Sequence, residues 1–313
     1  MKILRNVLLV LTIVVSMFLL LGCVEGQNPS DAASSEQIII EHELEKIAIV
    51  KEPERVIVFD YGVLDILDNI GVDIIGLPQT NVPAYLDKYK GDDYIDVGTL
   101  KEPNFETIYE LQPDLIIISG RQLDLYDEFK KIAPTLYLNI DGGDYINSFK
   151  FSLEALGRIF DKEEVLSKAF EDIEAKIAKL NELANTSGKN GLFIMANDGN
   201  LSAFGPGSRF GVVHKEFGIQ PTDGNIEDST HGSKVTFEYI LEMDPDILYV
   251  LDRATIAGGD VSAKQVLDND IIKSTKAYEN NNIIYLDPYI WYVTAGGLTA
   301  TNKMIDEIQS SLE

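Results

Sequence analysis

The amino-acid sequence predicts an α/β fold in which two lobes with mainly parallel sheets are joined by one long helix, with a cleft between the lobes. Three observations support this prediction. Short apolar segments rich in β-branched residues alternate with amphipathic stretches in both halves of the chain, which is typical of parallel strands covered by helices on both faces. A long helical stretch separates the halves, and each half contains a copy of one helix–turn–strand pattern.

Residues 1–22 are interpreted as a leader that precedes the fold. Lys2 and Arg5 come before an apolar run at 7–21, which is shorter than the roughly 20 residues that a membrane-spanning helix requires. The run ends in Leu-Leu-Gly-Cys, which resembles the lipobox of bacterial lipoproteins. We therefore expect cleavage before Cys23 and a lipid on Cys23 that anchors an extracytoplasmic protein to the cell membrane. The alternative is a signal anchor with an incidental cysteine.

Composition limits the partners and the organisation of the chain. The net charge is −25, which disfavours binding to nucleic acid or to anionic lipid. Cys23 is the only cysteine, so the fold cannot depend on an internal disulfide. Residues 23–37 are small and polar and predict a flexible tether. After the tether we expect an N-terminal lobe at 38–150, an interlobe helical region at 151–187 and a C-terminal lobe at 188–313.

The elements of both halves follow from apolar periodicity. The sequence QIIIEHELEKIAIV, which begins at residue 37, predicts a hairpin or meander. The expected strands of the first half are 56–60, 74–77 and 115–119, and its expected helices are 62–70 and 105–111. In the second half, strands are expected at 191–196, 246–252 and 282–287.

The stretch between the halves, from about residue 145 to 184, predicts helix with a break near Asp161. Apolar residues at three- and four-residue spacing give this stretch one apolar face. They are Val165, Leu166, Ala169, Phe170, Ile173, Ile177, Leu180 and Leu183. Because a single long helix is stiff, we expect the lobes to close only slightly around a ligand.

An internal repeat relates the two halves. Residues 104–121 align without gaps to residues 236–253, and each copy contains a capped helix, a Pro-Asp turn and an apolar strand. The copies end in Arg121 and Arg253. Open α/β sheets bind ligands at the carboxyl ends of their strands, so a pseudo-twofold axis would point both arginines into the same cleft. The alternative is that both copies are a common helix–turn–strand solution.

Four sequence blocks together resemble a known family. They are SAFGPGSRFG at 202–211, THGSKVTFEYIL at 230–241, VLDR at 250–253 and IIYLDP followed by WY at 283–292. The chain from about Ile38 onward resembles the siderophore-binding lipoproteins of ABC importers, which are solute-binding proteins with a helical backbone. Within that family it is most similar to the subgroup that takes ferric petrobactin and other catecholates.

The resemblance implies that Arg121, Arg209 and Arg253 bind the cargo from three loops. Guanidinium suits a ferric catecholate, because it stays charged, donates several hydrogen bonds and stacks on aromatic rings. Ser208 is expected to cap a helix that begins near Arg209, where exposed backbone amides favour an anion. For each arginine alone, a surface salt bridge is the alternative.

The resemblance also implies that His231 and Tyr292 ligate Fe(III) directly, but only when the siderophore is tetradentate. Imidazole and phenolate both suit iron. Trp291 is expected to line the ligand site. The alternatives are a solvated loop histidine and a purely structural aromatic pair.

No intrinsic cofactor is expected, because the Fe(III)-siderophore is cargo. His42 and His214 are expected to be structural, and a dedicated zinc site is not expected in a sequence with three histidines and one cysteine.

Glu106 and Glu238 lie in the first turns of the two repeated helices. In the resembled family, one acidic residue on each lobe docks arginines of the permease, which implies an ABC importer permease as the partner of a monomeric protein. Acids at these positions are also favoured by the helix dipole by about 0.3–1 kcal/mol, which is the structural alternative.

Two other functions remain open on sequence alone. One is the same fold with heme, a corrinoid or a ferric hydroxamate as cargo, because His231 with Tyr292 does not exclude heme. The other is a membrane-tethered enzyme. The sequence contains no Gly-x-Ser-x-Gly or His-Glu-x-x-His motif, so no catalytic residue is assigned.

Overall fold

The computed structural model describes residues 36–313. The predicted leader, Cys23 and the predicted tether up to residue 35 lie outside the described residues. Among residues 36–313, every helix is too short or too polar to cross a membrane.

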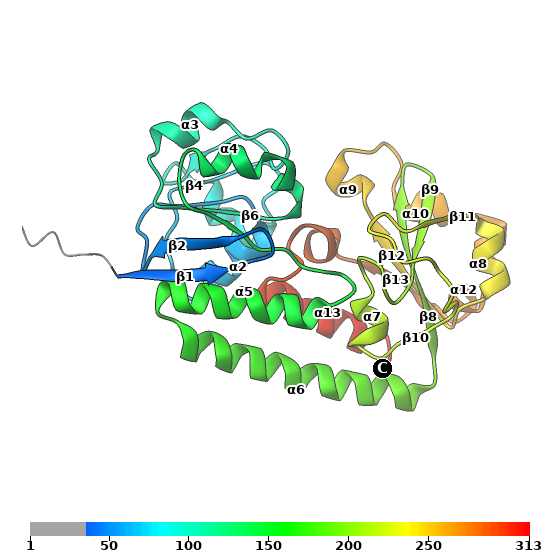
Figure 1. Cartoon of the computed structure of the whole chain (residues 1–313). Coiled ribbons are helices and arrows are strands. Elements are labelled where there is room, and N and C mark those ends of the chain that lie inside the picture. The colour runs from blue at the N-terminus through cyan, green and yellow to red at the C-terminus, as the bar shows by residue number, and fades with distance from the viewer. Residues whose placement is uncertain (1–35) are drawn as a thin grey trace, which may run out of the picture. The chain divides into compact units, whose positions relative to one another are not determined.

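The first lobe is built on an antiparallel hairpin and a parallel sheet of five strands, with the order β5-β4-β3-β6-β7. Figure 1 shows this lobe in blue, cyan and green, with helices on both sides of the sheet. Its strands are β1 (Gln37–Glu41), β2 (Lys46–Val50), β3 (Val56–Val58), β4 (Gly76–Leu77), β5 (Ile95–Asp96), β6 (Leu115–Ile118) and β7 (Thr135–Tyr137). Its helices are α2 (Tyr61–Asn69), η1 (Ala84–Lys90), α3 (Phe105–Glu110), η2 (Gly120–Leu125) and α4 (Tyr126–Lys130).

Two helices, α5 (Tyr145–Phe160) and α6 (Glu163–Ser187), follow the first lobe, as the sequence predicted. They are separated at Asp161, which adopts a left-handed conformation with φ 55°. The helix α6 runs beneath both lobes in Figure 1 and ends at Gly188, which is also left-handed. Leu166, Phe170 and Leu180 are buried on its apolar face. Val165 was predicted on the same face but is 54% exposed, because it lies one position beside the line that contacts α5.

The second lobe contains a mixed sheet of six strands. The strand β12 lies between β8 and β13 and is parallel to both. The strand β9 is antiparallel to its two neighbours, β8 and β11. The hairpin β8–β9 was not predicted. It turns at Asp198 and Gly199, which both have positive φ, as Asp-Gly hairpin turns do. The strands are β8 (Asn190–Asn197), β9 (Asn200–Phe204), β10 (Gln220–Pro221), β11 (Ser233–Val235), β12 (Ile247–Asp252) and β13 (Ile283–Leu286).

Short helices surround this sheet, and a longer one ends the chain. They are α7 (Val212–Lys215), α8 (Phe237–Met243), α9 (Ala254–Ala257), α10 (Ala263–Leu267), α11 (Asp270–Lys273), α12 (Lys276–Glu279), the π-helix η3 (Tyr289–Val293) and α13 (Leu298–Ser310). The last helix, α13, packs against α2 of the first lobe and against α6.

The internal repeat of the sequence is a repeat of structure. The strand β6 lies between β3 and β7, and β12 lies between β8 and β13. Asp114 accepts a hydrogen bond from Arg55 N at 3.0 Å, directly before β3. Asp246 accepts one from Asn190 N at 3.0 Å, at the start of β8. Each carboxylate thus ties the Pro-Asp turn to the neighbouring strand, and the loops at the carboxyl ends of β6 and β12 occupy equivalent places.

Leu166→Ala is expected to lower the free energy of unfolding by about 2–5 kcal/mol, because it removes a buried side chain between α5 and α6. Val165→Ala is the matched control and should change stability by less than about 0.5 kcal/mol, since that side chain is mostly exposed. Urea unfolding measures both. Equal losses in the two variants would contradict this account of the buried face of α6.

Candidate functional site

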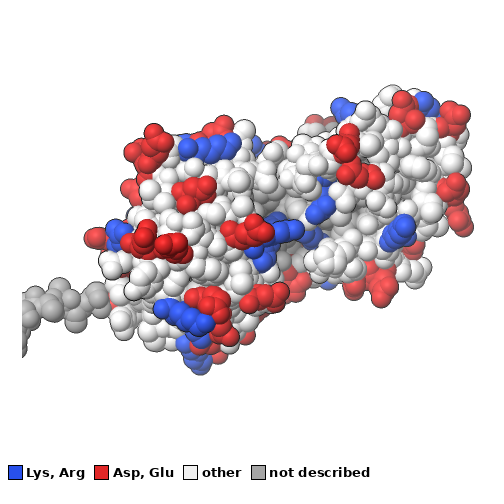
Figure 2. Space-filling view, turned by 90° about the horizontal axis from the view of Figure 1, so that it is seen from above, with Lys and Arg blue, Asp and Glu red and all other residues white. Residues whose placement is uncertain are grey.

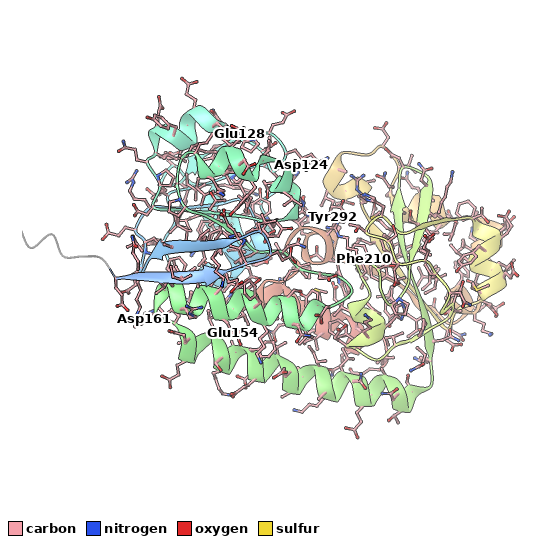
Figure 3. The ribbon with its side chains drawn as sticks, viewed as in Figure 1. Asp124, Glu128, Glu154, Asp161, Phe210 and Tyr292 are labelled. Atoms are coloured by element: carbon pink, nitrogen blue, oxygen red, sulfur yellow. The ribbon has the colours of Figure 1, made fainter. Side chains whose placement is uncertain are left out.

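A cavity of about 830 Å³ is lined by residues of both lobes. Its walls come from η2, from the loop after β7, from the glycine-rich loop after β9, from the loop before β11 and from η3. Basic side chains gather in the hollow between the two lobes in Figure 2, while acidic side chains dominate the surface around it. Asp124, Glu128 and Glu154, labelled in Figure 3, are exposed and do not line the cavity.

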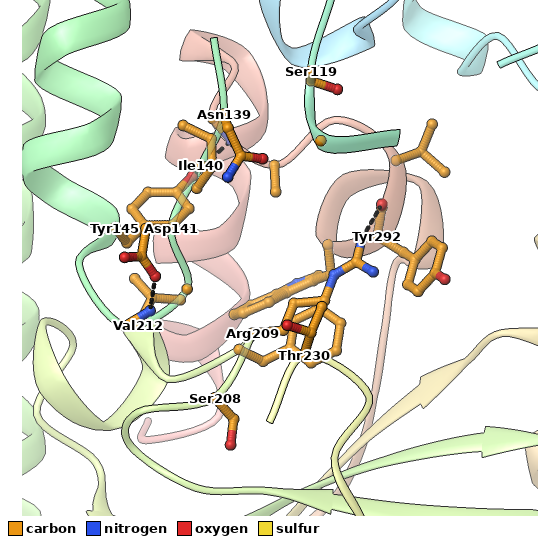
Figure 4. A pocket seen from close by; sticks show the side chains of 18 of the residues that line it. Ser119, Asn139, Ile140, Asp141, Tyr145, Ser208, Arg209, Val212, Thr230 and Tyr292 are labelled. Atoms are coloured by element: carbon orange, nitrogen blue, oxygen red, sulfur yellow. Dashed lines mark hydrogen bonds between the residues drawn. The ribbon is translucent and has the colours of Figure 1, made fainter. Parts of the chain in front are cut away.

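Two arginines from different lobes converge on one backbone carbonyl. Arg121 Nη2 donates to Tyr292 O at 2.8 Å, and Arg209 Nη2 donates to the same oxygen at 3.1 Å. Figure 4 shows the second of these bonds. Tyr292 lies near the end of η3, where helical carbonyls lack intrahelical partners, so the two guanidinium groups satisfy an acceptor that the helix leaves open.

A third arginine reaches the side chain of the same tyrosine. Arg253 directly follows β12, and its backbone N donates to Ala196 O at 2.9 Å, which fixes the start of its loop. Its guanidinium donates from Nη1 to Asn197 Oδ1 at 3.0 Å and from Nε to the Tyr292 hydroxyl at 3.2 Å. The arginines at the ends of the two repeated segments therefore meet at Tyr292, together with Arg209.

The ring of Tyr292 lies among the three guanidinium groups. The guanidinium carbon of Arg209 is 4.0 Å from the ring centroid, and those of Arg121 and Arg253 are 5.9 and 5.7 Å away. Cations over an aromatic face are attracted by its quadrupole. The residue lies in a π-helix, a rare conformation that is frequent at functional sites.

The electrostatics of the cluster favour an anion. Burial lowers the pKa of Arg209, and the charges of Arg121 and Arg253 act in the same direction. Burial acts to raise the pKa of the Tyr292 phenol, but the hydrogen bond from Arg253 and the charges of the three arginines outweigh it, so this pKa is lowered. Asp60 lies beside the cluster, with Oδ2 3.9 Å from Arg121 Nη1. Asp141 and Asp228 also line the cavity, and so does Lys101, so four basic side chains stand against three acidic ones.

The glycine-rich loop differs from the prediction for Ser208. The helix α7 begins at Val212, and Gly211 rather than Ser208 precedes it. Ser208 instead accepts from Gly205 N at 3.1 Å and closes a tight turn within the loop. The prediction of Ser208 as a helix cap was wrong, because residues 208–211 form a second turn before the helix starts.

The other two predicted residues of the ligand site, His231 and Trp291, differ in their exposure to solvent. His231 borders the cavity and is exposed, on a loop where its backbone N donates to Ser229 Oγ at 3.1 Å. Trp291 borders the cavity but has no exposed surface. Its indole donates to Glu307 at 2.6 Å and its ring lies 5.7 Å from that of Phe193. Trp291 thus supports the cavity wall from behind.

The remaining histidines have structural contacts. His42 is buried with Nε2 3.3 Å from the Tyr126 hydroxyl, and the His214 ring nitrogen Nδ1 is 2.9 Å from Ile219 O. Within residues 36–313, His, Cys, Asp and Glu side chains form no group of three or more that could hold a metal ion.

Glu106 and Glu238 are both exposed, in the first turns of α3 and α8. The caps of these helices, Asn104 and Thr236, accept from the backbone N–H three residues later, at 3.2 and 3.3 Å. The acids occupy equivalent places on the two lobes.

Sequence reasoning missed Asp60 and Asn197, which contact Arg121 and Arg253. A signal was present. Asp60 follows β3 and Asn197 ends β8, so both lie at the carboxyl ends of equivalent strands, where ligand sites of open α/β sheets form. Gly142 was also missed. A Cβ atom there would lie 2.4 Å from Arg209 Cα, so the two lobes touch at that glycine.

The model of the periplasmic binding protein family matches residues 56–290 of this chain. The chain is 49% identical over 282 residues to the petrobactin-binding protein YclQ of Bacillus subtilis, which covers 89% of each chain. It is 35% identical to the ferric-anguibactin-binding protein FatB of Vibrio anguillarum, over 87% of this chain and 86% of that protein.

Solved structures agree with these relatives. The crystal structure of YclQ has a TM-score of 0.87 and covers 89% of this chain and 99% of that chain, at 48% identity. The periplasmic catecholate-siderophore binding protein VctP of Vibrio cholerae has a TM-score of 0.83 and 36% identity, over 88% of this chain and 100% of that chain. The chain belongs to the periplasmic binding protein family.

Tyr292 should ionise at lower pH than buried tyrosines such as Tyr61 and Tyr85, whose pKa burial raises. In the unfolded chain the pKa of tyrosine is about 10. Ionised Tyr292 therefore contributes stability that is present above that pH and is lost as the pH falls through the lower folded value. An alkaline absorbance titration measures the phenolate.

Tyr292→Phe should lack this early step, and Arg253→Gln should move it to higher pH. An unchanged early step in Tyr292→Phe would assign the low pKa to another tyrosine.

Proposed function

We propose that this member of the periplasmic binding protein family captures a ferric siderophore of the catecholate type outside the cytoplasm and delivers it to an ABC importer for iron uptake. The observation that carries the proposal is the convergence of Arg121, Arg209 and Arg253 on Tyr292 in an interlobe cavity. A ferric catecholate is a compact anion with an aromatic shell. Guanidinium groups can donate to its oxygens and stack on its rings.

The relatives support this cargo class. YclQ is named for petrobactin, FatB for ferric anguibactin and VctP for catecholate siderophores. These proteins are solute-binding proteins rather than enzymes, and we infer that this chain likewise binds its cargo without converting it.

His231 and Tyr292 serve as direct iron ligands when a siderophore supplies only four donors. Both border the cavity, and the three arginines favour the phenolate form of Tyr292, a hard oxygen donor that suits Fe(III). The exposed imidazole of His231 lies on the loop between β10 and β11. With a hexadentate cargo, both side chains line the site without ligating iron.

Two features serve delivery. A lipid on Cys23 holds the protein, which is a monomer, at the membrane. Glu106 and Glu238 bind basic residues of the permease when the protein docks. The support for docking is that the two acids are exposed at equivalent places on the two lobes.

Titration of the purified protein with ferric tris-catecholate should quench the fluorescence of Trp291, the only tryptophan in the sequence. The quenching should saturate at low concentrations of the cargo, as expected for tight binding. A ferric hydroxamate and heme are the comparison cargoes. Arg253→Gln should weaken the binding of every catecholate by about tenfold or more, because hydrogen bonds to charged groups contribute about 1.5–3 kcal/mol. His231→Ala should weaken only a ferric bis-catecholate. His231 is the cleaner test of ligation, since a change at Tyr292 also disturbs the arginines.

If His231→Ala lowers the affinity for the bis- and the tris-catecholate equally, direct ligation of iron by His231 is refuted, while the proposed cargo class stands. Binding of heme or hydroxamate without binding of any catecholate would overturn the proposed cargo.

Glu106→Ala with Glu238→Ala should abolish stimulation of the importer's ATPase in reconstituted membranes while cargo affinity stays unchanged, because both acids lie on helices outside the cavity. The matched control changes two exposed acids of α6, Glu174→Ala with Glu182→Ala. Full stimulation by the Glu106/Glu238 variant would refute the docking role.

A further inference from the structure

The chain passes between the lobes a second time at residues 291–300. Trp291 packs against the second lobe, where its ring lies 5.7 Å from that of Phe193 on β8. A few residues later the chain is fixed to the first lobe. There Gly296 N donates to the Tyr145 hydroxyl at 2.9 Å, and Ala300 N donates to Asp65 at 2.9 Å. Tyr292 lies between these two attachments.

Asp65 is a carboxylate without exposed surface in the middle of α2. Burial of a carboxylate is costly unless donors satisfy it. Its oxygens accept from Ala300 N at 2.9 Å, Thr299 N at 3.2 Å, the Tyr85 hydroxyl at 3.2 Å and Asn69 Nδ2 at 2.8 Å. Two of these donors are the backbone amides of the second and third residues of α13, where the helix dipole favours negative charge. The acid therefore fastens the N-terminus of α13 to α2.

The backbone around residue 297 packs closely against α2. A Cβ atom on Gly297 would lie 2.1 Å from Asp65 Oδ2, and one on Gly62 would lie 2.6 Å from Ala295 O. The segment that follows Tyr292 thus lies directly against α2, with no side chain between them.

The residue that caps the N-terminus of the same helix lies beside the arginine cluster. Asp60 caps α2 by accepting from Gly62 N and Val63 N at 2.9 and 3.0 Å, and its second oxygen lies 3.9 Å from Arg121 Nη1. Through Asp60 and Asp65, α2 sets the distance between Arg121 and the tyrosine whose carbonyl it contacts.

We propose that Asp65 is a positioning residue of the cargo site, which holds α13 against α2 and thereby fixes Tyr292 among the three arginines. The proposal rests on the proposed function for its effect on binding. A purely structural role would lower stability and leave the arrangement of the arginines unchanged in the molecules that fold.

Asp65→Asn is the main test, because the amide has the same shape but presents N–H to donors. Binding of a synthetic ferric tris-catecholate to the purified protein should weaken by about tenfold, the factor that ~1.4 kcal/mol produces. In a Tyr292→Ala background the same change should cost about threefold or less, since the effects of two residues are not additive when one acts through the other. Equal factors in both backgrounds, or wild-type affinity in folded Asp65→Asn, would overturn the proposal.

A second readout needs no cargo. Acrylamide quenching of the fluorescence of Trp291, measured without cargo, should increase in Asp65→Asn, because α13 no longer holds the segment after Trp291 against α2. Unchanged quenching would also overturn the proposal. If wild-type protein binds no catecholate, the proposed function fails, and this quenching measurement alone decides the role of Asp65.

Asp246→Asn is the matched control. It removes a carboxylate that accepts from Asn190 N at the start of β8, and it should lower stability without changing the affinity for cargo or the quenching of Trp291. Tyr85→Phe carries the test if Asp65→Asn does not fold. It removes one donor to Asp65 and should weaken binding in the same direction by a smaller factor, and an unchanged affinity would count against the proposal.

Discussion

The site depends on keeping three guanidinium groups together while no anion is bound. Like charges at close range repel, and the repulsion grows as burial removes water. The structure meets this constraint mainly with neutral acceptors, and Asp60 adds a carboxylate 3.9 Å from Arg121 Nη1. The Tyr292 carbonyl receives Arg121 and Arg209, and its hydroxyl receives Arg253. A carboxylate in the same place would neutralise the cluster and compete with an anionic cargo. A carbonyl and a phenol orient the cluster without neutralising it.

The two lobes supply this cluster by the same structural rule. Each repeated segment ends in an arginine at the carboxyl end of a central strand, and each has a polar partner at the end of the neighbouring strand, Asp60 or Asn197. Arg209 has no counterpart in the repeat and comes from the glycine-rich loop that the first lobe touches at Gly142. The site therefore combines a symmetric pair with one added residue, and the added residue lies nearest the tyrosine ring.

The sequence predicted what periodicity and repetition encode. The helices around Asp161, the central strands and the shared position of Arg121 and Arg253 follow from local patterns. Ser208 was misread, because a glycine-rich segment can make two successive turns before a helix starts. The β8–β9 hairpin turns at Asp198-Gly199, a dipeptide typical of hairpins that apolar periodicity does not detect. Asp65 left no such signal. It occupies a buried position of α2, and its donors on α13 are more than two hundred residues away. Only the folded chain brings them together.

The connection between the lobes has a consequence for how an importer recognises a loaded protein. One helix of 25 residues and one short segment fastened to α2 leave little freedom for a hinge. On the proposed function, occupancy therefore changes the electrostatic potential of the molecule more than its outline. Figure 2 shows basic side chains between the lobes among many acidic ones, with further basic side chains elsewhere on the surface. An anionic cargo would offset the charge of the basic side chains between the lobes, so a permease with basic docking residues would distinguish the loaded protein by its charge.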